Sequence, residues 1–277
     1  MNTNIQYLGT AAAEGWPGIF CRCEACRNAR ALGGKNLRTR SQAVIDGTLL
    51  VDFPPDSYLH MLRDGLNLPD IHDILITHTH QDHFYPDDFL FRCGGFASGV
   101  EGVLTLYGND TLKRTYTRFV EDKPNREIIK QRVACRELTE FVPAIIGGYR
   151  VTPLLANHAK NEKCFLYEIE KNQKRLFYGN DTGYFPDATW DYLVGRPLDL
   201  VSLDCTMLKF QEGTNHMGIA DVLEVCKRLE SIGCVHKDTR IVITHFSHNG
   251  QLLHHEIEAL ANPHGWTVAY DGLNVSF

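Results

Sequence analysis

The sequence predicts a protein of mixed α/β class that forms a single domain. Short apolar runs typical of β-strands alternate with helical segments along the 277 residues. Two of these runs, 74–76 and 241–243, are each followed by Thr-His, and they lie in opposite halves of the chain. This repeated arrangement fits two similar halves that face each other. Because neither a shift in composition nor a long linker divides the chain, we expect one domain over residues 1–277.

The expected strands are short runs rich in β-branched and aromatic residues, bounded by turn residues. They cover residues 5–8, 43–45, 48–52, 74–76, 103–107, 149–155, 165–170, 175–178, 200–204 and 241–245. The second and third should form a hairpin across Asp46-Gly47, a favoured turn pair. The expected helices cover residues 56–66, 86–92, 219–229 and part of the charged region 111–140. We expect Asp56 to cap the first helix and Gly65 to lie near its end.

The composition is that of an ordinary globular protein. Hydrophobic residues make up 43% of the chain, charged residues make up 22%, and the formal net charge is −6. This charge argues against a basic surface for long nucleic acids, although it allows a small anionic substrate held by metal. No run of about eighteen apolar residues is present, so no membrane span is expected. Nine cysteines and no signal-peptide pattern at residues 1–4 indicate a reducing, cytoplasmic location.

Three thiols stand within six residues, in the pattern Cys21-x-Cys23-x-x-Cys26. A disulfide within this segment would leave one thiol unpaired, and a reducing compartment disfavours it. Tetrahedral zinc takes four ligands, commonly three cysteines and one histidine. We therefore expect a structural zinc-binding loop near residues 21–26, with a fourth ligand from elsewhere in the chain.

The densest group of candidate metal ligands is His78-x-His80-x-Asp82-His83, which follows the apolar run 74–76. Residues two apart in a strand share a face, so His78 and His80 are expected to point at one ion. Asp82 and His83 follow where the strand must end, so they can reach a neighbouring ion. Neutral imidazole and carboxylate bind zinc, manganese or iron. The simpler alternative is a run of exposed polar residues, but a turn does not require this order.

This motif after an apolar strand resembles the signature of the metallo-β-lactamase superfamily. The resemblance implies a four-layer αββα sandwich with a dinuclear metal site at one edge of its two sheets. It also implies further ligands downstream, and these stand in the expected order. They are His158 in Asn157-His158, Asp181 in Asp181-Thr182-Gly183 and His245 in Thr244-His245.

The resemblance divides seven ligands between two ions. One ion would be held by His78, His80 and His158, the other by Asp82, His83 and His245, with Asp181 bridging them. Taken alone, His158 could be a buried core histidine, and Asp181 could belong to a plain turn. Asp52, which ends another expected strand, could orient a metal-bound histidine or cap the turn before Pro54-Pro55. The sequence does not decide between these two roles for Asp52.

The full set of motifs resembles the PhnP type of phosphodiesterase, the phosphoribosyl cyclic phosphate hydrolases associated with carbon–phosphorus lyase. The motifs run from Cys21 to His248, most of the chain. In that family a histidine just beyond the last active-site histidine joins three cysteines on a structural zinc, so His248 would be the fourth ligand. An extra histidine assists phosphodiester cleavage there, and His216 is the match by its position. The alternative for His216 is an ordinary histidine of a surface loop.

The implied reaction is hydrolysis of a small phosphodiester, with a cyclic ribose phosphate as the expected substrate. Two active-site ions (zinc, manganese or iron) would share a hydroxide that attacks phosphorus and would neutralise charge on the phosphoryl oxygens. His216 would protonate the departing alkoxide, and Asp82 is counted with it as catalytic. A homodimer is compatible with the sequence.

Three other interpretations share the same motifs. An RNA-processing nuclease of the superfamily should carry an RNA-binding extension or a basic patch, and neither is evident in the sequence. A lactone or thioester hydrolase would use the same metals on carbon. A non-hydrolytic relative of the pyrroloquinoline quinone biosynthesis accessory protein would have a similar cysteine cluster. The complete ligand set favours a hydrolase.

Overall fold

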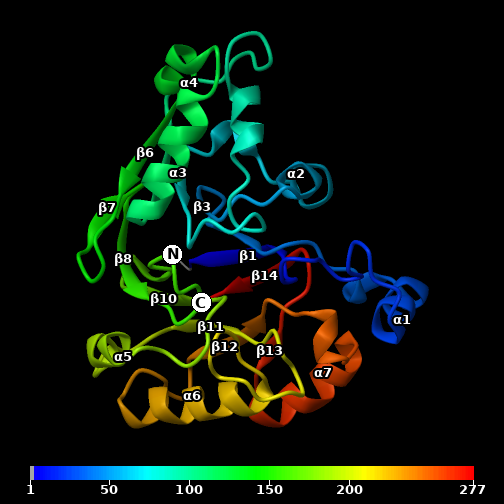
Figure 1. Cartoon of the computed structure of the whole chain (residues 1–277). Coiled ribbons are helices and arrows are strands. Elements are labelled where there is room, and N and C mark those ends of the chain that lie inside the picture. The colour runs from blue at the N-terminus through cyan, green and yellow to red at the C-terminus, as the bar shows by residue number, and fades with distance from the viewer. Residues whose placement is uncertain (1–2) are drawn as a thin grey trace.

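The computed structural model describes residues 3–277, and the strands in this range form two seven-stranded sheets (Figure 1). The first sheet has the spatial order β14 (Leu273–Ser276), β1 (Asn4–Gly9), β2 (Gln42–Ile45), β3 (Leu49–Val51), β4 (Asp73–Leu75), β5 (Leu104–Gly108) and β6 (Val133–Glu137). The second has the order β13 (Thr267–Val268), β12 (Arg240–Thr244), β11 (Leu200–Asp204), β10 (Lys174–Gly179), β9 (Phe165–Lys171), β8 (Tyr149–Leu155) and β7 (Ala144–Ile146).

The two sheets share one pattern of strand directions. Strands β3 to β6 are parallel in the first sheet, and strands β10 to β13 are parallel in the second. The remaining neighbours pair antiparallel. Candidate ligands follow the carboxyl ends of β4, β10 and β12, the position where ligands commonly bind in sheets with parallel strands. The repeated pattern fits the expected two similar halves.

Helices lie on the outer sides of the two sheets (Figure 1). The α-helices are α1 (Glu24–Leu32), α2 (Ser57–Asp64), α3 (Asp110–Glu121), α4 (Arg126–Arg132), α5 (Asp187–Leu193), α6 (Ile219–Ser231) and α7 (His254–Ala261). Short 3₁₀ helices cover Gly34–Asn36, Leu68–Asp70, Pro86–Arg92, His248–Gly250 and Asn262–His264. No helix within residues 3–277 has the length and apolar character needed to cross a bilayer.

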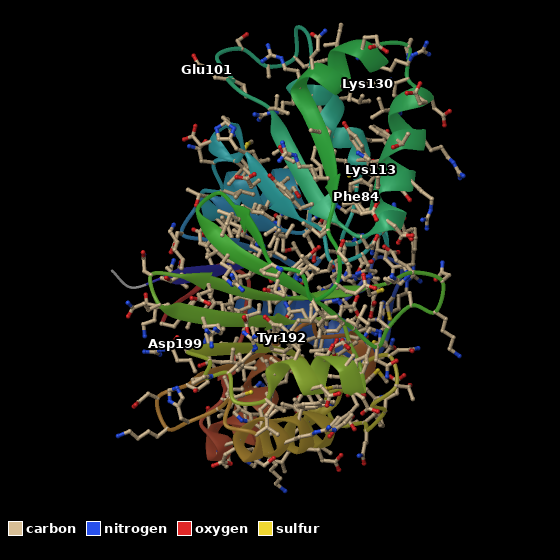
Figure 2. The ribbon with its side chains drawn as sticks, turned by 90° about the vertical axis from the view of Figure 1, so that its left-hand side faces the viewer. Phe84, Glu101, Lys113, Lys130, Tyr192 and Asp199 are labelled. Carbon is tan, nitrogen blue, oxygen red and sulfur yellow. The ribbon has the colours of Figure 1, made fainter. Side chains whose placement is uncertain are left out.

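Three clusters of buried apolar side chains separate four layers. Ile5 and Tyr167 belong to the cluster between the two sheets. Leu112 of α3 belongs to the cluster that joins the first sheet to α3 and α4. Trp190 and Val225 belong to the cluster that joins the second sheet to α5, α6 and α7. The order helix, sheet, sheet, helix confirms the predicted αββα sandwich, and Figure 2 shows the sheets crossing the middle of the molecule.

Most expected elements are present, with ends shifted by one or two residues. The hairpin across Asp46-Gly47 is confirmed: both residues have positive φ (49° and 69°), and β2 pairs antiparallel with β3. Asp56 is the N-cap residue of α2, as predicted, but its side chain makes no capping hydrogen bond. Its carboxylate instead accepts hydrogen bonds from the backbone and guanidinium of Arg40. Gly65, in the left-handed conformation, ends this helix as expected.

The strands that the sequence did not predict are β6, β7, β13 and β14, and each lies at an edge of its sheet. Edge strands are partly exposed; for example, only one of the three residues of β7 is buried. They therefore lack the continuous apolar run that identifies a central strand. The sequence also did not predict the helices α1, α5 and α7, each of nine residues or fewer.

Candidate metal centre

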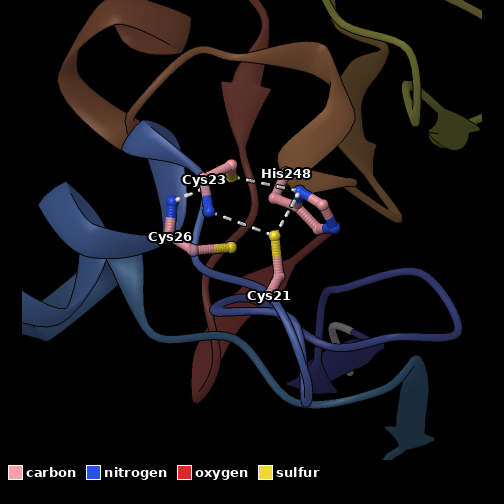
Figure 3. A group of neighbouring side chains, drawn as sticks. All are labelled: Cys21, Cys23, Cys26 and His248. Atoms are coloured by element: carbon pink, nitrogen blue, oxygen red, sulfur yellow. Dashed lines mark hydrogen bonds between the residues drawn. The ribbon is translucent and has the colours of Figure 1, made fainter.

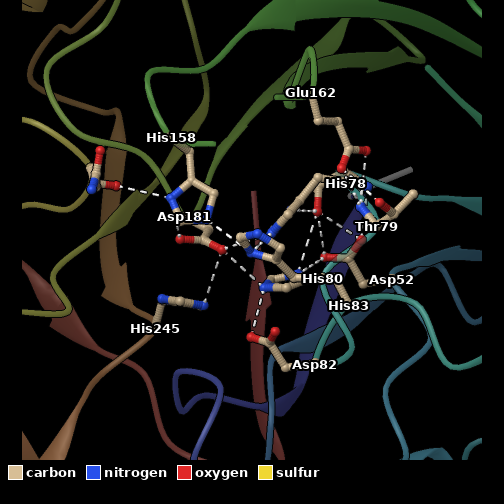
Figure 4. A network of polar contacts seen from close by, with 12 residues as sticks. Asp52, His78, Thr79, His80, Asp82, His83, His158, Glu162, Asp181 and His245 are labelled. Carbon is tan, nitrogen blue, oxygen red and sulfur yellow. Dashed lines mark hydrogen bonds and ion pairs between the residues drawn. The ribbon is translucent and has the colours of Figure 1, made fainter. Parts of the chain in front are cut away.

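The first group of candidate ligands gathers around an irregular loop. The expectation that His78 and His80 share a strand face is wrong, because β4 ends at Leu75 and both residues follow it. The loop nevertheless brings Nε2 of His78 to 2.9 Å from Nδ1 of His80, which lies 3.2 Å from Nε2 of His158. His78 Nε2 also lies 3.3 Å from Oδ2 of Asp181 (Figure 4). The candidate ligand atoms of this group lie within 4.8 Å of one another.

The second group consists of Asp82, His83, Asp181 and His245, and all four are buried. Nε2 of His83 lies 3.1 Å from Oδ2 of Asp82 and 3.1 Å from Oδ2 of Asp181. Nε2 of His245 lies 3.7 Å from the same oxygen of Asp181. Asp181 therefore belongs to both groups, as a bridging carboxylate must. Asp181 and His245 have positive φ (57° and 62°), a strained conformation that is frequent at functional sites.

Asp52 contacts the second group through His83. Its carboxylate accepts hydrogen bonds from Nδ1 of His83 at 2.7 Å and from the backbone amide and hydroxyl of Thr77 at 2.8 and 2.9 Å. These contacts fix the ring of His83 with Nε2 toward Asp82 and Asp181. They fit the first of the two roles considered for Asp52, the orientation of a metal-binding histidine.

Asp204 has a similar place in the second half of the chain, and the sequence analysis missed it. It is fully buried at the end of β11 and accepts hydrogen bonds from the amide and hydroxyl of Thr206 and from the amide of Met217. Its Oδ2 lies 3.4 Å from Nδ1 of His245. The signal was available, since Asp204 ends an apolar strand much as Asp52 follows one.

His216 lies beside the shared carboxylate. Its Nδ1 is 3.2 Å from Oδ1 of Asp181 and 3.3 Å from Oδ2 of Asp204. Burial by itself would lower the pKa of His216, but the neighbouring carboxylates of Asp181 and Asp204 outweigh burial and raise this pKa to about 11. The expectation that His216 belongs near the active site therefore agrees with its position. Together with His245, these side chains form a third group whose polar atoms lie close together.

The three cysteines of the 21–26 loop meet His248, as expected. Nδ1 of His248 lies 3.7 Å from the sulfur of Cys21 and 3.5 Å from that of Cys23 (Figure 3). Each sulfur accepts a backbone amide hydrogen bond: Cys21 from Cys23, Cys23 from Cys26 and Cys26 from Gly18. All nine cysteines are free. Such amides stabilise thiolates, and the amide of Cys23 lowers the pKa of Cys21, whereas burial raises that of Cys26 to about 12.

The donors present fit divalent metal ions. Nε2 of His83, Nε2 of His245 and Oδ1 of Asp181 are buried without a hydrogen-bond partner in the described residues. An unpaired buried polar atom costs free energy, so atoms that approach one another without hydrogen-bond geometry indicate a shared ligand. Imidazole, carboxylate and thiolate are the donor types that zinc accepts, and the first two also suit manganese and iron.

The charges at the site compensate one another. Burial alone would raise the pKa of Asp181, but His245, His216 and His83 outweigh it and hold this pKa well below its ordinary value. Burial and the neighbouring His83 lower the pKa of His78 well below its ordinary value. The carboxylate is thus ionised and the imidazole of His78 neutral, and these are the forms that bind metal.

The two active-site groups open into a cleft of about 270 Å³. Its lining residues are Ala12, Ala13, Glu14, His80, Asp82, His158, Asp181, Thr206, Met207, His216, His245, Ser247 and Asn249. A larger cavity of about 650 Å³ is lined mainly by apolar side chains and contains no candidate ligand. Because chemistry requires the titratable groups, the smaller cleft is the candidate active site.

Glu162 is a further polar residue that the sequence analysis missed. Its carboxylate accepts hydrogen bonds from the amide and hydroxyl of Thr79 at 3.0 and 2.7 Å, and from the side chain of Asn109 at 2.8 Å. Thr79 lies between His78 and His80, so Glu162 fixes the loop that presents both imidazoles (Figure 4). A single acidic residue in a loop carries no sequence signal of this role.

Residues 48–246 match the model of the family described as "Beta-lactamase superfamily domain", and this range includes all seven candidate ligands of the two active-site groups. The chain belongs to the metallo-β-lactamase superfamily. The N-terminal thiolate loop, with Cys21, Cys23 and Cys26, lies before the matched range. The family assignment therefore rests on the sandwich and its metal motifs, and not on the cysteines.

Members of the metallo-β-lactamase superfamily resemble this chain over nearly its whole length. "Coenzyme PQQ synthesis protein B" of Methylorubrum extorquens (strain PA1) is 28% identical, over 98% of this chain and 99% of that protein. A diphosphatase from the PhnP family has a TM-score of 0.77 at 24% identity, over 100% and 98% of the two chains. Zinc-bound PqqB from Methylobacterium extorquens has a TM-score of 0.74 at 21% identity, over 99% and 100%. At these identities the solved structures show a shared fold and do not show a shared activity.

Proposed function

We propose that this superfamily member is a metal-dependent phosphodiesterase that hydrolyses a small phosphodiester, with a cyclic ribose phosphate as the expected substrate. The observation that carries the proposal is the membership of Asp181 in both active-site groups. One carboxylate shared by two sets of ligands is the arrangement that holds two ions a few ångströms apart. The likeness to a diphosphatase of the PhnP family supports phosphorus as the reacting atom.

The proposed ligands are the seven residues given by the sequence. His78, His80 and His158 would hold one divalent ion, Asp82, His83 and His245 would hold the other, and Asp181 would be shared between them. Zinc, manganese and iron all suit these donors. When bound, the two ions would neutralise charge on phosphoryl oxygens and allow water to act as a nucleophile near neutral pH. A structural zinc is proposed at Cys21, Cys23, Cys26 and His248.

His216 is proposed as the proton donor to the leaving group. Its Nδ1 faces Asp181 and Asp204, and its side chain lines the cleft with 24% of its surface exposed. Its Nε2 makes no hydrogen bond within residues 3–277, so this atom is free to carry a proton toward the substrate. Asp82 acts in catalysis through its place among the ligands of the second ion.

The proposed partner is a small phosphodiester and not a long nucleic acid. None of the cleft's lining residues is lysine or arginine, the side chains that bind nucleic-acid phosphates. We keep a cytoplasmic location and a homodimer as further proposals, the first because nine free cysteines suit a reducing compartment.

The test is a substrate panel with metal-loaded protein. We expect hydrolysis of ribose cyclic phosphate and of bis(p-nitrophenyl) phosphate, measured as phosphate monoester formed, with weak or no turnover of β-lactams, lactones and thioesters. An Asp181→Asn variant, loaded in the same way, controls for hydrolysis by free or contaminating metal. A preference for a lactone or thioester would contradict the proposal, because the attacked atom would then be carbon and not phosphorus.

A second candidate function follows from the sequence relatives. The first matched curated proteins bear the name "Coenzyme PQQ synthesis protein B", at 27–28% identity over 98% of this chain. Such a relative would use the fold for binding or oxygen chemistry without hydrolysis. Metal analysis separates the two: two active-site ions fit hydrolysis, whereas a single redox-active iron with no turnover of the panel supports the second candidate.

A further inference from the structure

Glu14 connects the thiolate group to the active-site cleft. Its Oε1 accepts a hydrogen bond from the hydroxyl of Ser247 at 2.5 Å and lies 3.5 Å from Nε2 of His248. The other ring nitrogen of His248 faces Cys23 and Cys21. A carboxylate at the far nitrogen of a metal-binding histidine is a common way to fix the ring. Neither Glu14 nor Ser247 was singled out by the sequence.

The backbone that carries Glu14 is held firmly. The amide of Ala12 donates to the carbonyl of Phe246, and the amide of Phe246 donates to the carbonyl of Thr10, at 3.0 and 2.8 Å. Beyond Glu14, Gly18 packs so closely on His248 that a Cβ atom would lie 3.1 Å from the ring. On both sides of Glu14 the segment thus contacts the stretch after β12 that carries His245 and His248.

Glu14 also changes the charge of the cleft. It lines the cleft together with Ser247 and Asn249, outside both active-site ligand groups. No lysine or arginine lines the cleft to offset it. Its Oε1 is occupied by Ser247 and His248, whereas its Oε2 makes no hydrogen bond within residues 3–277. A fixed carboxylate with one free oxygen attracts hydrogen-bond donors and repels further anionic groups.

We infer that Glu14 is a specificity-determining residue, which accepts a hydrogen bond from a hydroxyl group of a singly phosphorylated substrate and disfavours substrates that carry a second phosphate. The inference rests on the proposed function, because it places the reacting phosphoryl group at the seven-ligand centre. In this position bound metal ions would neutralise one phosphate. A second phosphate would meet no lysine or arginine and the additional carboxylate of Glu14, while the imidazole of His216 is already paired with Asp181 and Asp204. A sugar hydroxyl would find an acceptor in Glu14.

Ligand binding tests the inference without turnover. The affinities of inorganic phosphate and ribose 5-phosphate are measured by titration calorimetry on zinc-loaded wild type, Glu14→Gln and Glu14→Ala. Removing the charge should tighten phosphate binding about fivefold in both variants, the effect of one partly exposed charge. Wild type should prefer ribose 5-phosphate to phosphate, and Glu14→Ala should lose about fivefold of this preference, the effect of one hydrogen bond. Unchanged phosphate affinity in the two variants would overturn the inference.

The matched control is Glu224→Gln, which removes the same charge from an exposed position on α6, outside every ligand group. This variant should leave the affinities for phosphate and for ribose 5-phosphate unchanged. An equal gain in phosphate affinity would show that the effect of Glu14→Gln comes from the net charge of the protein. Zinc content is measured in every protein. Glu14→Gln keeps an acceptor for Ser247 and His248, so it tests the charge even where Glu14→Ala loses the thiolate zinc.

Turnover then tests the substrate preference. Ribose cyclic phosphate is compared with the same compound carrying a second phosphate on the 5-hydroxyl. Glu14→Gln should raise kcat/KM for the doubly phosphorylated compound about fivefold relative to the other, mainly through KM. An unchanged ratio contradicts the inference. If wild type hydrolyses neither compound while the binding results hold, the proposed function fails and the role of Glu14 in ligand selection stands.

Discussion

Nδ1 of His83 donates a hydrogen bond to Oδ2 of Asp52 at 2.7 Å, and both side chains are buried. Asp204 has the matching relation to His245, with 3.4 Å between Oδ2 and Nδ1. One pair comes from the loops of the first sheet and the other from those of the second. Each half of the sandwich thus supplies an imidazole to the second ligand group and a carboxylate that fixes the ring.

The Asp52–His83 pair predicts a loss of metal affinity on substitution. Asp52→Asn removes the charge that fixes the Nδ1 proton of His83, so Nε2 is presented less reliably. Loss of such a partner typically costs about tenfold to hundredfold in metal affinity or activity. The measurement is competition for active-site zinc with a chromophoric chelator. Asp199→Asn is the control and should retain wild-type zinc affinity. It removes a carboxylate that pairs with Lys174 and belongs to no ligand group.

A second prediction concerns the number of ions. The thiolate group and the two groups that share Asp181 predict about three metals per chain in fully loaded protein. The thiolate ion should resist mild chelation, because binding of zinc by thiolates is coupled to folding. Elemental analysis before and after dialysis against a weak chelator measures both. Two or fewer ions in active, fully loaded protein would contradict the assignment.

Substitutions in the active-site groups and in the thiolate group should have different effects on activity and stability. Asp181→Asn removes the shared carboxylate and should abolish turnover while the thiolate zinc stays bound. Cys23→Ser removes a thiolate ligand and should lower Tm. Because His248 lies three residues after His245, Cys23→Ser should also reduce activity in part. Near-normal turnover by metal-loaded Asp181→Asn would show that this carboxylate does not bridge two ions.

His60 predicts a pH dependence of stability. It is fully buried between Gln42 and Thr39, and burial, with a smaller contribution from Arg63, lowers its pKa to about 3. An unfolded histidine has a pKa of about 6.5, so between these values the unfolded chain binds more protons than the folded chain. The contribution of His60 to stability is therefore present above pH 6.5 and is lost as the pH falls toward 3.

The dependence of the free energy of unfolding on pH can be measured by denaturant unfolding. Between pH 6.5 and 5.5 this one group should lower the free energy of unfolding by about 1 kcal/mol. His60→Gln should be less stable overall but should lack this part of the pH dependence, when both proteins are unfolded with urea at saturating zinc. His255→Gln, at an exposed position, should retain the wild-type slope. Equal slopes for all three proteins would assign the acid sensitivity to other groups.

The sequence predicted the centre of each sheet better than its edges. The run 200–204 coincides with β11, which is buried throughout, because a central strand must be apolar on both faces. At the edges, β7 and β14 each have only one buried residue, and their pattern is not distinct from that of a loop. The helical prediction for 111–140 was correct for α3 and α4. Strand β6, which follows α4, was missed because it is also a partly exposed edge strand.

The candidate site shows a similar division. Residues that stand in a motif with other candidate ligands, such as His78 and Asp181, were predicted and lie together. Glu14 and Glu162 were missed because each is a single acidic residue whose partners are distant in sequence, whereas Asp204 ends an apolar run and could have been predicted from it. Glu14 and its partner Ser247, for example, are 233 residues apart. Such partners are brought together only by the packing of the two halves, which no local pattern encodes.

The last prediction concerns the role of His216 as proton donor. General acid catalysis matters in proportion to how poor the leaving group is, because a sugar alkoxide needs a proton and a nitrophenolate does not. Such help is typically worth on the order of a hundredfold to ten-thousandfold in rate. His216→Ala should therefore lose much of its kcat/KM on ribose cyclic phosphate and far less on bis(p-nitrophenyl) phosphate.

The contacts of His216 make a control necessary, because Nδ1 lies within 3.3 Å of both Asp181 and Asp204. A variant could thus lose activity by disturbing the shared carboxylate, and that loss would be equal on the two substrates. Metal content is measured for each protein. His216→Asn serves as a second variant, because asparagine is polar but has no acidic proton to transfer near neutral pH. Unequal losses with both active-site ions retained support the proton donor, whereas equal losses leave His216 as a residue that orients Asp181.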